Sequence, residues 1–296
     1  MKRKLRSLYL AWQVGARAKQ LREALFELHC RLTFKKRIVS VFLQLDDPYS
    51  YLLSHYLGAL MRRYQHKVQF KFYLCQALGA EFMPQPGMLA DYALLDSKRL
   101  AKKFNIPFLD VSETPTVEFR SQLLEFLAGE QEEDDFAETM FSALKLYWRG
   151  DNEGVRKLLG RPCADGDETD ILVGKNQLLL RKMGHYNCAT MHYAGDWYWG
   201  VDRLMYLVRH LDRQKLNYSN DPIEDLVSMI EASKLKLPAA VPAAVKSLPP
   251  LELFFSFRSP YSYLSLKSTL AIAKSFGLHL EVRPICLLYT SPSPRA

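Results

Sequence analysis

The chain has 296 residues, of which 48% are hydrophobic, so it can bury a full core and is long enough for one or two domains. Its formal charge of +8 is concentrated in residues 1–37, which carry eleven lysines and arginines against Glu23 and Glu27. Because the rest of the chain is close to neutral, the charge distribution argues against a nucleic-acid-binding surface. The sequence has no run of ~18 apolar residues that could span a membrane and no signal-peptide core, so we expect a cytoplasmic protein.

The basic segment 1–37 has the apolar spacing of an amphipathic helix that is interrupted near Gly15. The regularly spaced leucines in its second half are Leu21, Leu25, Leu28 and Leu32. This pattern predicts a helix whose leucine face packs against the following domain. The alternative is a peripheral, interfacial helix on anionic membrane lipid, because basic residues flank an apolar face that includes Trp12.

A six-residue phrase occurs twice and organises the rest of the sequence. Asp47–Leu52 reads DPYSYL, and Ser259–Leu264 reads SPYSYL 212 residues later (259 − 47). Each copy follows a strand-like apolar run and begins a helical pattern. The next strand-like segment, 68–72, has its counterpart at the same interval in 280–284. The sequence therefore predicts a duplicated α/β unit whose second copy starts near residue 251 and is truncated.

The segment between the two copies has both helical and strand patterns. Three helical stretches, a hairpin and a further helix are expected at 92–104, 117–127, 136–148, 191–199 and 201–211. These elements predict one α/β domain over residues 38–232, with its hairpin turning at Ala194-Gly195. A Pro/Ala-rich linker over 233–250 and the start of the second domain over 251–286 follow it. Residues 287–296 have no core-forming pattern, and we interpret them as a non-native tail.

The five cysteines do not form a C-x-x-C pair; they are Cys30, Cys75, Cys163, Cys188 and Cys286. A dithiol oxidoreductase needs an attacking thiolate and a nearby resolving thiol, so this spacing disfavours that activity. An odd number of cysteines without an export signal indicates free and mostly buried thiols. His55, His185 and His192 lack a metal-ligand spacing, and the sequence predicts no metal site.

Four short segments resemble parts of one protein family. They are residues 96–101 (DSKRLA), 184–190 (GHYNCAT), 199–204 (WGVDRL) and 257–264 (FRSPYSYL). They resemble the DsbA-like thioredoxin-fold proteins, which include 2-hydroxychromene-2-carboxylate isomerases and kappa-class glutathione transferases. The resemblance covers about residues 38–212 and resumes at 251–286. It implies a thioredoxin-like α/β fold with a helical insertion, here in tandem, and glutathione as a cosubstrate.

The resemblance also implies roles for particular residues. The family has a serine at a helix N-terminus beside the glutathione sulfur, and this catalytic serine corresponds to Ser259. Its hydroxyl and the helix dipole would favour a bound thiolate, which would add to a small electrophile in an isomerase or transferase reaction. The glutathione contacts implied in the first domain are Asp47, Cys188, Ala189, Thr190 and Asp202. The residues alone also fit a structural interpretation, in which Ser259 and Asp202 are helix N-caps.

The first domain departs from the family pattern at two positions. Asp47 stands in place of the serine, and its charge would oppose the ionisation of a nearby thiol. Ala189 stands where the family has a cis-proline, so we expect a trans peptide bond there. The alternative is therefore a non-catalytic first domain that serves as a scaffold or binding module for the second copy or a partner, including a second chain in a homodimer. If this domain arose by decay of an active site, Asp47→Ser with Ala189→Pro would restore glutathione binding.

Overall fold

The computed structural model describes residues 15–76, 86–108, 120–160, 166–218, 226, 230–231, 248–257 and 259–285. The chain divides into two compact units, Met1–Ser233 and Lys234–Ala296. None of the described helices is long and apolar enough to cross a membrane. The predicted tail and most of the predicted linker lie outside the described residues.

A four-stranded mixed sheet forms the centre of the first unit. The strands are Arg37–Gln44 (β1), Val68–Cys75 (β2), Thr190–Tyr193 (β3) and Asp196–Trp199 (β4). Their order is β2-β1-β3-β4, with β1 parallel to β2 and antiparallel to β3, and β3 antiparallel to β4. The strands β3 and β4 form the predicted hairpin. Ala194 and Gly195 both have positive φ, as a two-residue type I′ turn requires.

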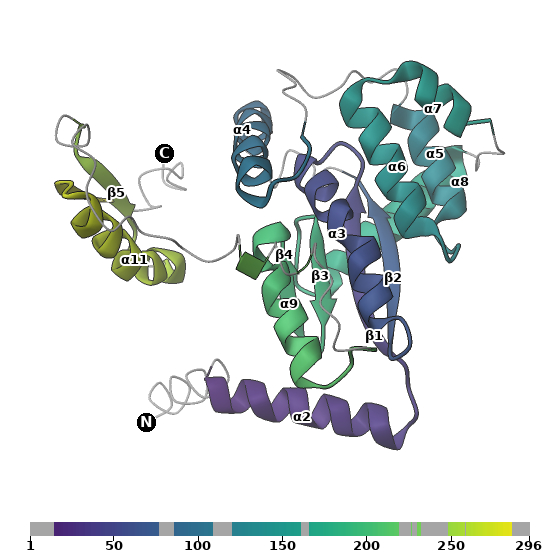
Figure 1. The fold of residues 1–296 in the computed structure, drawn as a ribbon, viewed down its shortest axis with the longest axis horizontal. Coiled ribbons are helices and arrows are strands. Elements are labelled where there is room, and N and C mark those ends of the chain that lie inside the picture. The colour runs from purple at the N-terminus through teal and green to yellow at the C-terminus, as the bar shows by residue number, and fades with distance from the viewer. Residues whose placement is uncertain are drawn as a thin grey trace, which may run out of the picture. The chain divides into compact units, whose positions relative to one another are not determined.

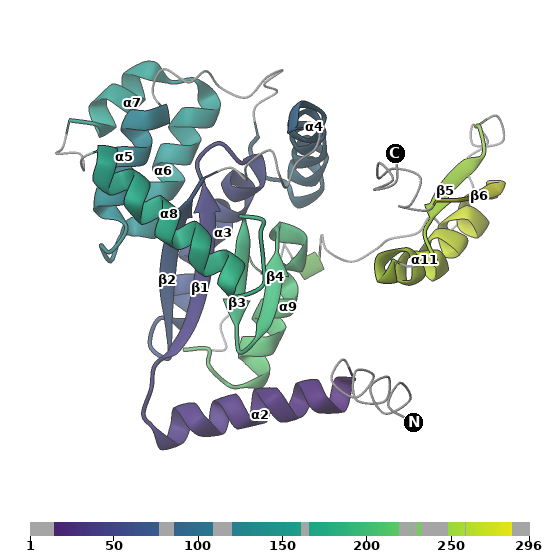
Figure 2. The same ribbon diagram turned by 180° about the vertical axis from the view of Figure 1, so that it is seen from behind.

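Helices cover both faces of this sheet. Figure 1 shows α3 and α9 on one face, and Figure 2 shows α8 crossing the other. The helices are Ala16–Leu32 (α2), Pro48–Tyr64 (α3), Pro86–Phe104 (α4), Arg120–Glu130 (α5), Phe136–Arg149 (α6), Asn152–Leu158 (α7), Gly166–Lys182 (α8) and Val201–Arg213 (α9). Helices α4 to α8 form an insertion between β2 and β3. This mixed α/β arrangement is consistent with the predicted thioredoxin-like fold and its helical insertion.

The sequence patterns predicted α4, α5, α6 and α9 but not α7 or α8. The buried face of α8 includes the polar residues Thr169, Asn176 and Gln177, so this helix has no continuous apolar stripe. The Asn176 side chain donates to the Leu74 carbonyl of β2 at 2.8 Å and to the Gln131 side chain at 2.8 Å. Hydrogen bonds to the edge strand therefore replace part of the apolar contact. The apolar periodicity by which a helix is predicted from sequence is weak in α8 for this reason.

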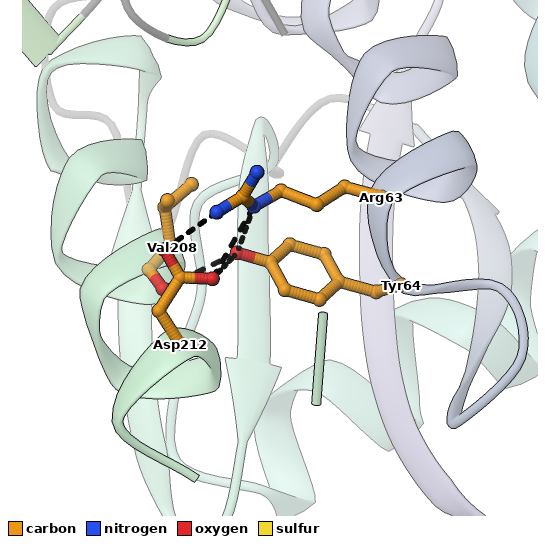
Figure 3. Close-up of polar contacts among 4 residues, drawn as sticks. All are labelled: Arg63, Tyr64, Val208 and Asp212. Carbon is orange, nitrogen blue, oxygen red and sulfur yellow. Dashed lines mark hydrogen bonds and ion pairs between the residues drawn. The ribbon is translucent and has the colours of Figure 1, made fainter. Parts of the chain in front are cut away.

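A polar cluster fastens the C-terminal end of α3 to α9 (Figure 3). Arg63 Nε and Nη2 donate to the two carboxylate oxygens of Asp212 at 3.2 and 3.1 Å. The buried Tyr64 hydroxyl lies 2.7 Å from Asp212 Oδ1 and 3.3 Å from the Val208 carbonyl oxygen. These contacts fix one end of the helix whose other end carries the candidate site.

Helix α2 packs on the first unit through a face that the leucine pattern did not predict. Glu23 and Glu27 are buried, whereas Leu21, Leu25, Leu28 and Leu32 are between 49% and 70% exposed. The Tyr193 hydroxyl donates to Glu27, and Arg37 pairs with the same carboxylate at 2.7 Å. The prediction that the leucine face packs on the domain is therefore wrong, because hydrogen bonds and an ion pair hold the opposite face.

The second unit contains a parallel strand–helix–strand segment. Its elements are Leu251–Phe255 (β5), Pro260–Phe276 (α11) and Leu280–Pro284 (β6). Helices α3 and α11 both have 17 residues and begin at the same point of the repeated phrase. The strand pairing differs, since Val39 pairs with Phe70, whereas its counterpart Leu251 pairs with Leu280 instead of Val282. A shift of two residues keeps every side chain on its original face of the sheet.

Candidate functional site

The candidate site lies where β1 ends and α3 begins. Asp47 is the N-cap of α3: its Oδ1 accepts the Tyr49 amide at 3.2 Å, and its Oδ2 accepts the Ser50 amide at 3.0 Å and the Ser50 hydroxyl at 2.7 Å. Ser50 Oγ accepts the Gln44 amide of β1 at 3.1 Å. Both carboxylate oxygens are thus engaged, and the protein's own carboxylate fills an anion-binding helix N-terminus.

The environment of Asp47 opposes its ionisation. Burial raises the pKa of Asp47 to about 6, although the hydrogen bonds from Ser50 and Tyr49 act in the opposite direction. The neighbouring charge of Asp46 raises this pKa further. At neutral pH most molecules still carry the charge, which disfavours a thiolate at the same place.

Cys188 lies at the same end of the sheet, beside Cys75 at the end of β2. Both thiols are free and buried in a small cluster with Phe42 and Leu180, so the prediction of a buried, free Cys188 is confirmed. The pKa of Cys188 is raised well above its usual range, first by a hydrogen bond with the Cys75 thiol, then by burial and by nearby charges that include Asp47. A thiol that stays protonated at neutral pH is a poor nucleophile.

Ala189 and Thr190 continue this loop into β3. Every peptide bond in the described residues is trans, as expected for Ala189, whose φ is 53°. The Ala189 carbonyl accepts the Gly200 amide at 2.8 Å, and the Thr190 hydroxyl donates to the Tyr198 carbonyl at 3.4 Å. Proline requires φ near −65°, so this backbone excludes the Ala189→Pro restoration that the sequence suggested.

Asp202 lies in the first turn of α9. Its acidic neighbour Asp96 also contacts Tyr49 of α3. The Tyr49 hydroxyl donates to Asp96 Oδ2 at 3.0 Å, and the Tyr49 ring lies 6.2 Å from the Trp199 ring. Burial is the main factor that raises the pKa of Asp202, and the charge of Asp96 raises it further. The N-cap of α9 is Gly200, not Asp202, so the capping interpretation of Asp202 is wrong. Gly200 has a φ of 77°, a backbone conformation that favours glycine.

The fold brings the five implied glutathione contacts to one end of the first unit, while Ser259 belongs to the second unit. Ser259 is the N-cap of α11, as its structural interpretation predicted, and its Oγ accepts the Ser262 amide at 3.3 Å. The site neighbours that the sequence did not reveal are Gln44, Ser50, Cys75, Asp96 and Arg120, the last of which donates to Asp46 at 3.0 Å. Of these residues, only Cys75 could have been placed at the site from the sequence. It follows the second predicted strand, and the carboxyl ends of adjacent parallel strands meet at one edge of a sheet.

Comparisons with known proteins add little to this geometry. No protein-family model and no curated protein sequence matches the chain. A solved 2-hydroxychromene-2-carboxylate isomerase is 16% identical with a TM-score of 0.42, over 60% of this chain and 96% of that one. A Nitrosomonas europaea protein provisionally described as a protein disulfide isomerase is 12% identical with a TM-score of 0.45, over 61% of this chain and 99% of that one. Similarity at this level does not show what activity this chain has.

Proposed function

We propose that the first unit is a non-catalytic binding or scaffold module of thioredoxin-like fold, and that glutathione-dependent chemistry belongs to the second unit at Ser259. One observation carries the proposal: the Asp47 carboxylate occupies the N-terminus of α3 with both of its oxygens. In this proposal the two units are copies of one domain whose helix caps have diverged.

The chemistry of the two caps supports this division. An ionised carboxylate only accepts hydrogen bonds, so Asp47 has no proton to give to a sulfur anion and repels its charge. A serine hydroxyl accepts and donates at once. Ser259 accepts the Ser262 amide and keeps its own O–H for a ligand. The N-terminus of α11 favours the same negative charge.

The proposed reaction follows from a thiolate held at Ser259. The glutathione sulfur forms a bond to an electrophilic carbon of a small unsaturated molecule, and the electron pair of the attacked double bond takes up a proton. In an isomerase the carbon–sulfur bond breaks again after rearrangement, whereas in a transferase it remains. The thiols of Cys75 and Cys188 do not take part.

Calorimetric titration of the full chain with glutathione tests the proposal. We expect binding that Ser259→Ala weakens at least tenfold, and that Asp47→Asn, the matched change in the other cap, leaves unchanged. Binding that survives Ser259→Ala and disappears in Asp47→Asn would assign the site to the first unit. Absence of binding by the unmodified chain would refute the glutathione chemistry and leave the scaffold role of the first unit standing.

We also propose that α2 lies on an anionic membrane surface. The observation in favour is the exposed leucine face of this helix, beside the exposed basic residues Arg17, Arg22, Arg31, Lys35 and Lys36. We expect the full chain to float with phosphatidylserine vesicles and Leu25→Glu to abolish flotation. Ile171→Glu, at an exposed apolar position on α8, is the matched control. A dimer that Leu25→Glu dissociates, without lipid binding, would assign the face to a second copy of the chain instead.

A further inference from the structure

Three side chains from distant parts of the first unit, on α2, β4 and α9, lie close together. Glu23 comes from α2, Asp196 from the start of β4 and His210 from the last turn of α9, and Figure 1 shows α2 passing the C-terminal end of α9. One carboxylate oxygen of each acid and one imidazole nitrogen lie within 4.8 Å of one another. The His210 Nε2 atom is 3.8 Å from Glu23 Oε1. This cluster takes no part in the site at the N-terminus of α3.

Two of these ligand atoms are buried without a hydrogen-bond partner. Glu23 is 6% exposed and His210 is 1% exposed, yet neither Glu23 Oε1 nor His210 Nε2 has a hydrogen-bond partner. Leaving a buried polar atom unpaired costs about 1–3 kcal/mol, and more for a charged group. Two such atoms aimed at one point indicate a ligand that satisfies both, and a carboxylate with an imidazole nitrogen calls for a cation.

The imidazole of His210 is held as a metal ligand is held. The Tyr198 hydroxyl lies 2.6 Å from His210 Nδ1, on the side of the ring away from the cluster. A hydrogen bond at Nδ1 fixes the ring orientation, and with Nδ1–H as the donor the Nε2 lone pair faces the carboxylates. Burial is the main factor that lowers the pKa of His210, although the charge of Glu23 acts in the opposite direction.

Two basic side chains also face the cluster. Lys19 Nζ lies 2.7 Å from Asp196 Oδ2 and 3.9 Å from Glu23 Oε1, whereas Arg213 lies 3.6 Å from the other oxygen of Glu23. The Lys19 ammonium thus stands where a metal cation would stand. Since 45% of the Lys19 side chain is exposed, it can withdraw into solvent, and Arg213 leaves Glu23 Oε1 available.

We propose that Glu23, Asp196 and His210 bind one divalent metal ion of the zinc type, with Lys19 displaced. One nitrogen and two oxygen ligands with water in the fourth position suit Zn²⁺. In a tetrahedral site with zinc–ligand bonds of about 2.0–2.2 Å, the ligand atoms are roughly 3.3–3.5 Å apart. The 3.8 Å between His210 Nε2 and Glu23 Oε1 is close to this separation, and the three ligand atoms, which lie within 4.8 Å of one another, would draw together on the ion. The ion would fasten α2 to the hairpin and to α9.

The test is a titration of the full, chelator-stripped chain with Zn²⁺ by calorimetry, supported by the visible spectrum of the Co²⁺ form. We expect one tightly bound ion per chain, at least tenfold weaker binding in His210→Gln and Asp196→Asn, and tighter binding in Lys19→Ala, which lacks the competing ammonium. His192→Gln is the matched control, because His192 lies on the same hairpin and packs against Trp197, 4.6 Å away, on the opposite face of the sheet.

Two results would overturn the metal site. One is zinc binding that His210→Gln and Asp196→Asn leave unchanged; the other is a Co²⁺ spectrum with a strong thiolate charge-transfer band, which would place the ion on cysteines. If the buried His210→Gln variant fails to fold, the surface variant Lys19→Ala tests the metal site instead. We expect Zn²⁺ to raise its melting temperature by more than that of the unmodified chain, and no rise in either protein would refute the proposal.

Discussion

The segments β1-α3-β2 and β5-α11-β6 have the same local structure but different surroundings. In both, a serine of the repeated phrase ties the strand to the helix: Ser50 accepts the Gln44 amide at 3.1 Å, and Ser262 accepts the Ser256 amide at 3.2 Å. Both helices start at a capped N-terminus followed by proline. The caps and the strand–helix hydrogen bond are local, so each copy forms them by itself.

The difference between the two segments is burial. Tyr51 is 3% exposed and donates to the Pro107 carbonyl, whereas its counterpart Tyr263 is 75% exposed. Leu52 is fully buried, and its counterpart Leu264 is 69% exposed. In the first unit the helices of the insertion and α9 cover these positions; among the described residues of the second unit no such helices occur. The comparison shows that this phrase determines the helix, while distant elements determine the packing.

The largest effect is expected from the matched leucines. Leu52→Ala should destabilise the first unit by about 3 kcal/mol, through lost apolar contact and a cavity, whereas Leu264→Ala should change stability by less than ~0.5 kcal/mol. Denaturant unfolding followed by tryptophan fluorescence reports on the first unit, and circular dichroism reports on both. Equal losses of stability in the two variants would contradict the difference in burial between Leu52 and Leu264.

The next effect concerns His55, whose counterpart in the second unit is the exposed Lys267. Burial, with a smaller contribution from Lys145, lowers the pKa of His55 to about 4, and its ring packs edge-on against Tyr51 and Phe141. The unfolded chain binds the extra proton near pH 6.5, so stability is lost as the pH falls from about 6.5 to 4.

We expect His55→Phe to remove on the order of 2–3 kcal/mol of this acid-induced loss, because the ring contacts remain and the titrating group does not. Melting temperatures measured from pH 7 to pH 4 would show a flatter profile than that of the unmodified chain. Lys267→Gln should leave the profile unchanged. An identical acid profile in His55→Phe would contradict the buried, neutral histidine.

A third test contrasts the two helix caps. Because the folded pKa of Asp47 is raised to about 6, the folded state binds the extra proton, and stability falls as the pH rises from about 4 to 6. Asparagine caps a helix as well as aspartate does, so Asp47→Asn should stabilise the chain by about 2 kcal/mol at pH 7.5 and by little at pH 4. Ser259→Asn should show no pH-dependent effect. A stabilisation by Asp47→Asn that does not vary with pH would contradict the raised pKa.

The smallest effect is expected from the serines that tie strand to helix. Ser50→Ala removes a buried acceptor and a donor to Asp47, and should cost about 1–2 kcal/mol. Ser262→Ala removes the equivalent, partly exposed contact and should cost less than ~1 kcal/mol. A larger loss from Ser262→Ala, measured by circular dichroism, would show that the second segment depends more on its local contacts than the first.

The sequence predicted the elements whose signals are local. The hairpin turn at Ala194-Gly195, the cap at Ser259 and the helices of the repeat follow from positive φ, capping and proline preferences. It did not predict α8, whose inner face is polar, or the inward face of α2, where Glu23 and Glu27 are held by partners far away in the chain. Hydrophobic periodicity fails wherever hydrogen bonds and ion pairs replace apolar contact.

The two helix starts that share the repeated phrase can be read from the sequence, because each signal lies within a few residues of the next. The packing of distant elements, in contrast, buries Asp47 and so raises its pKa, places Cys75 against Cys188, and brings Glu23, Asp196 and His210 together. Each of these features depends on elements that only the sheet order and helix packing bring together. Their chemistry depends on burial, which is a property of the packed domain and not of neighbouring residues.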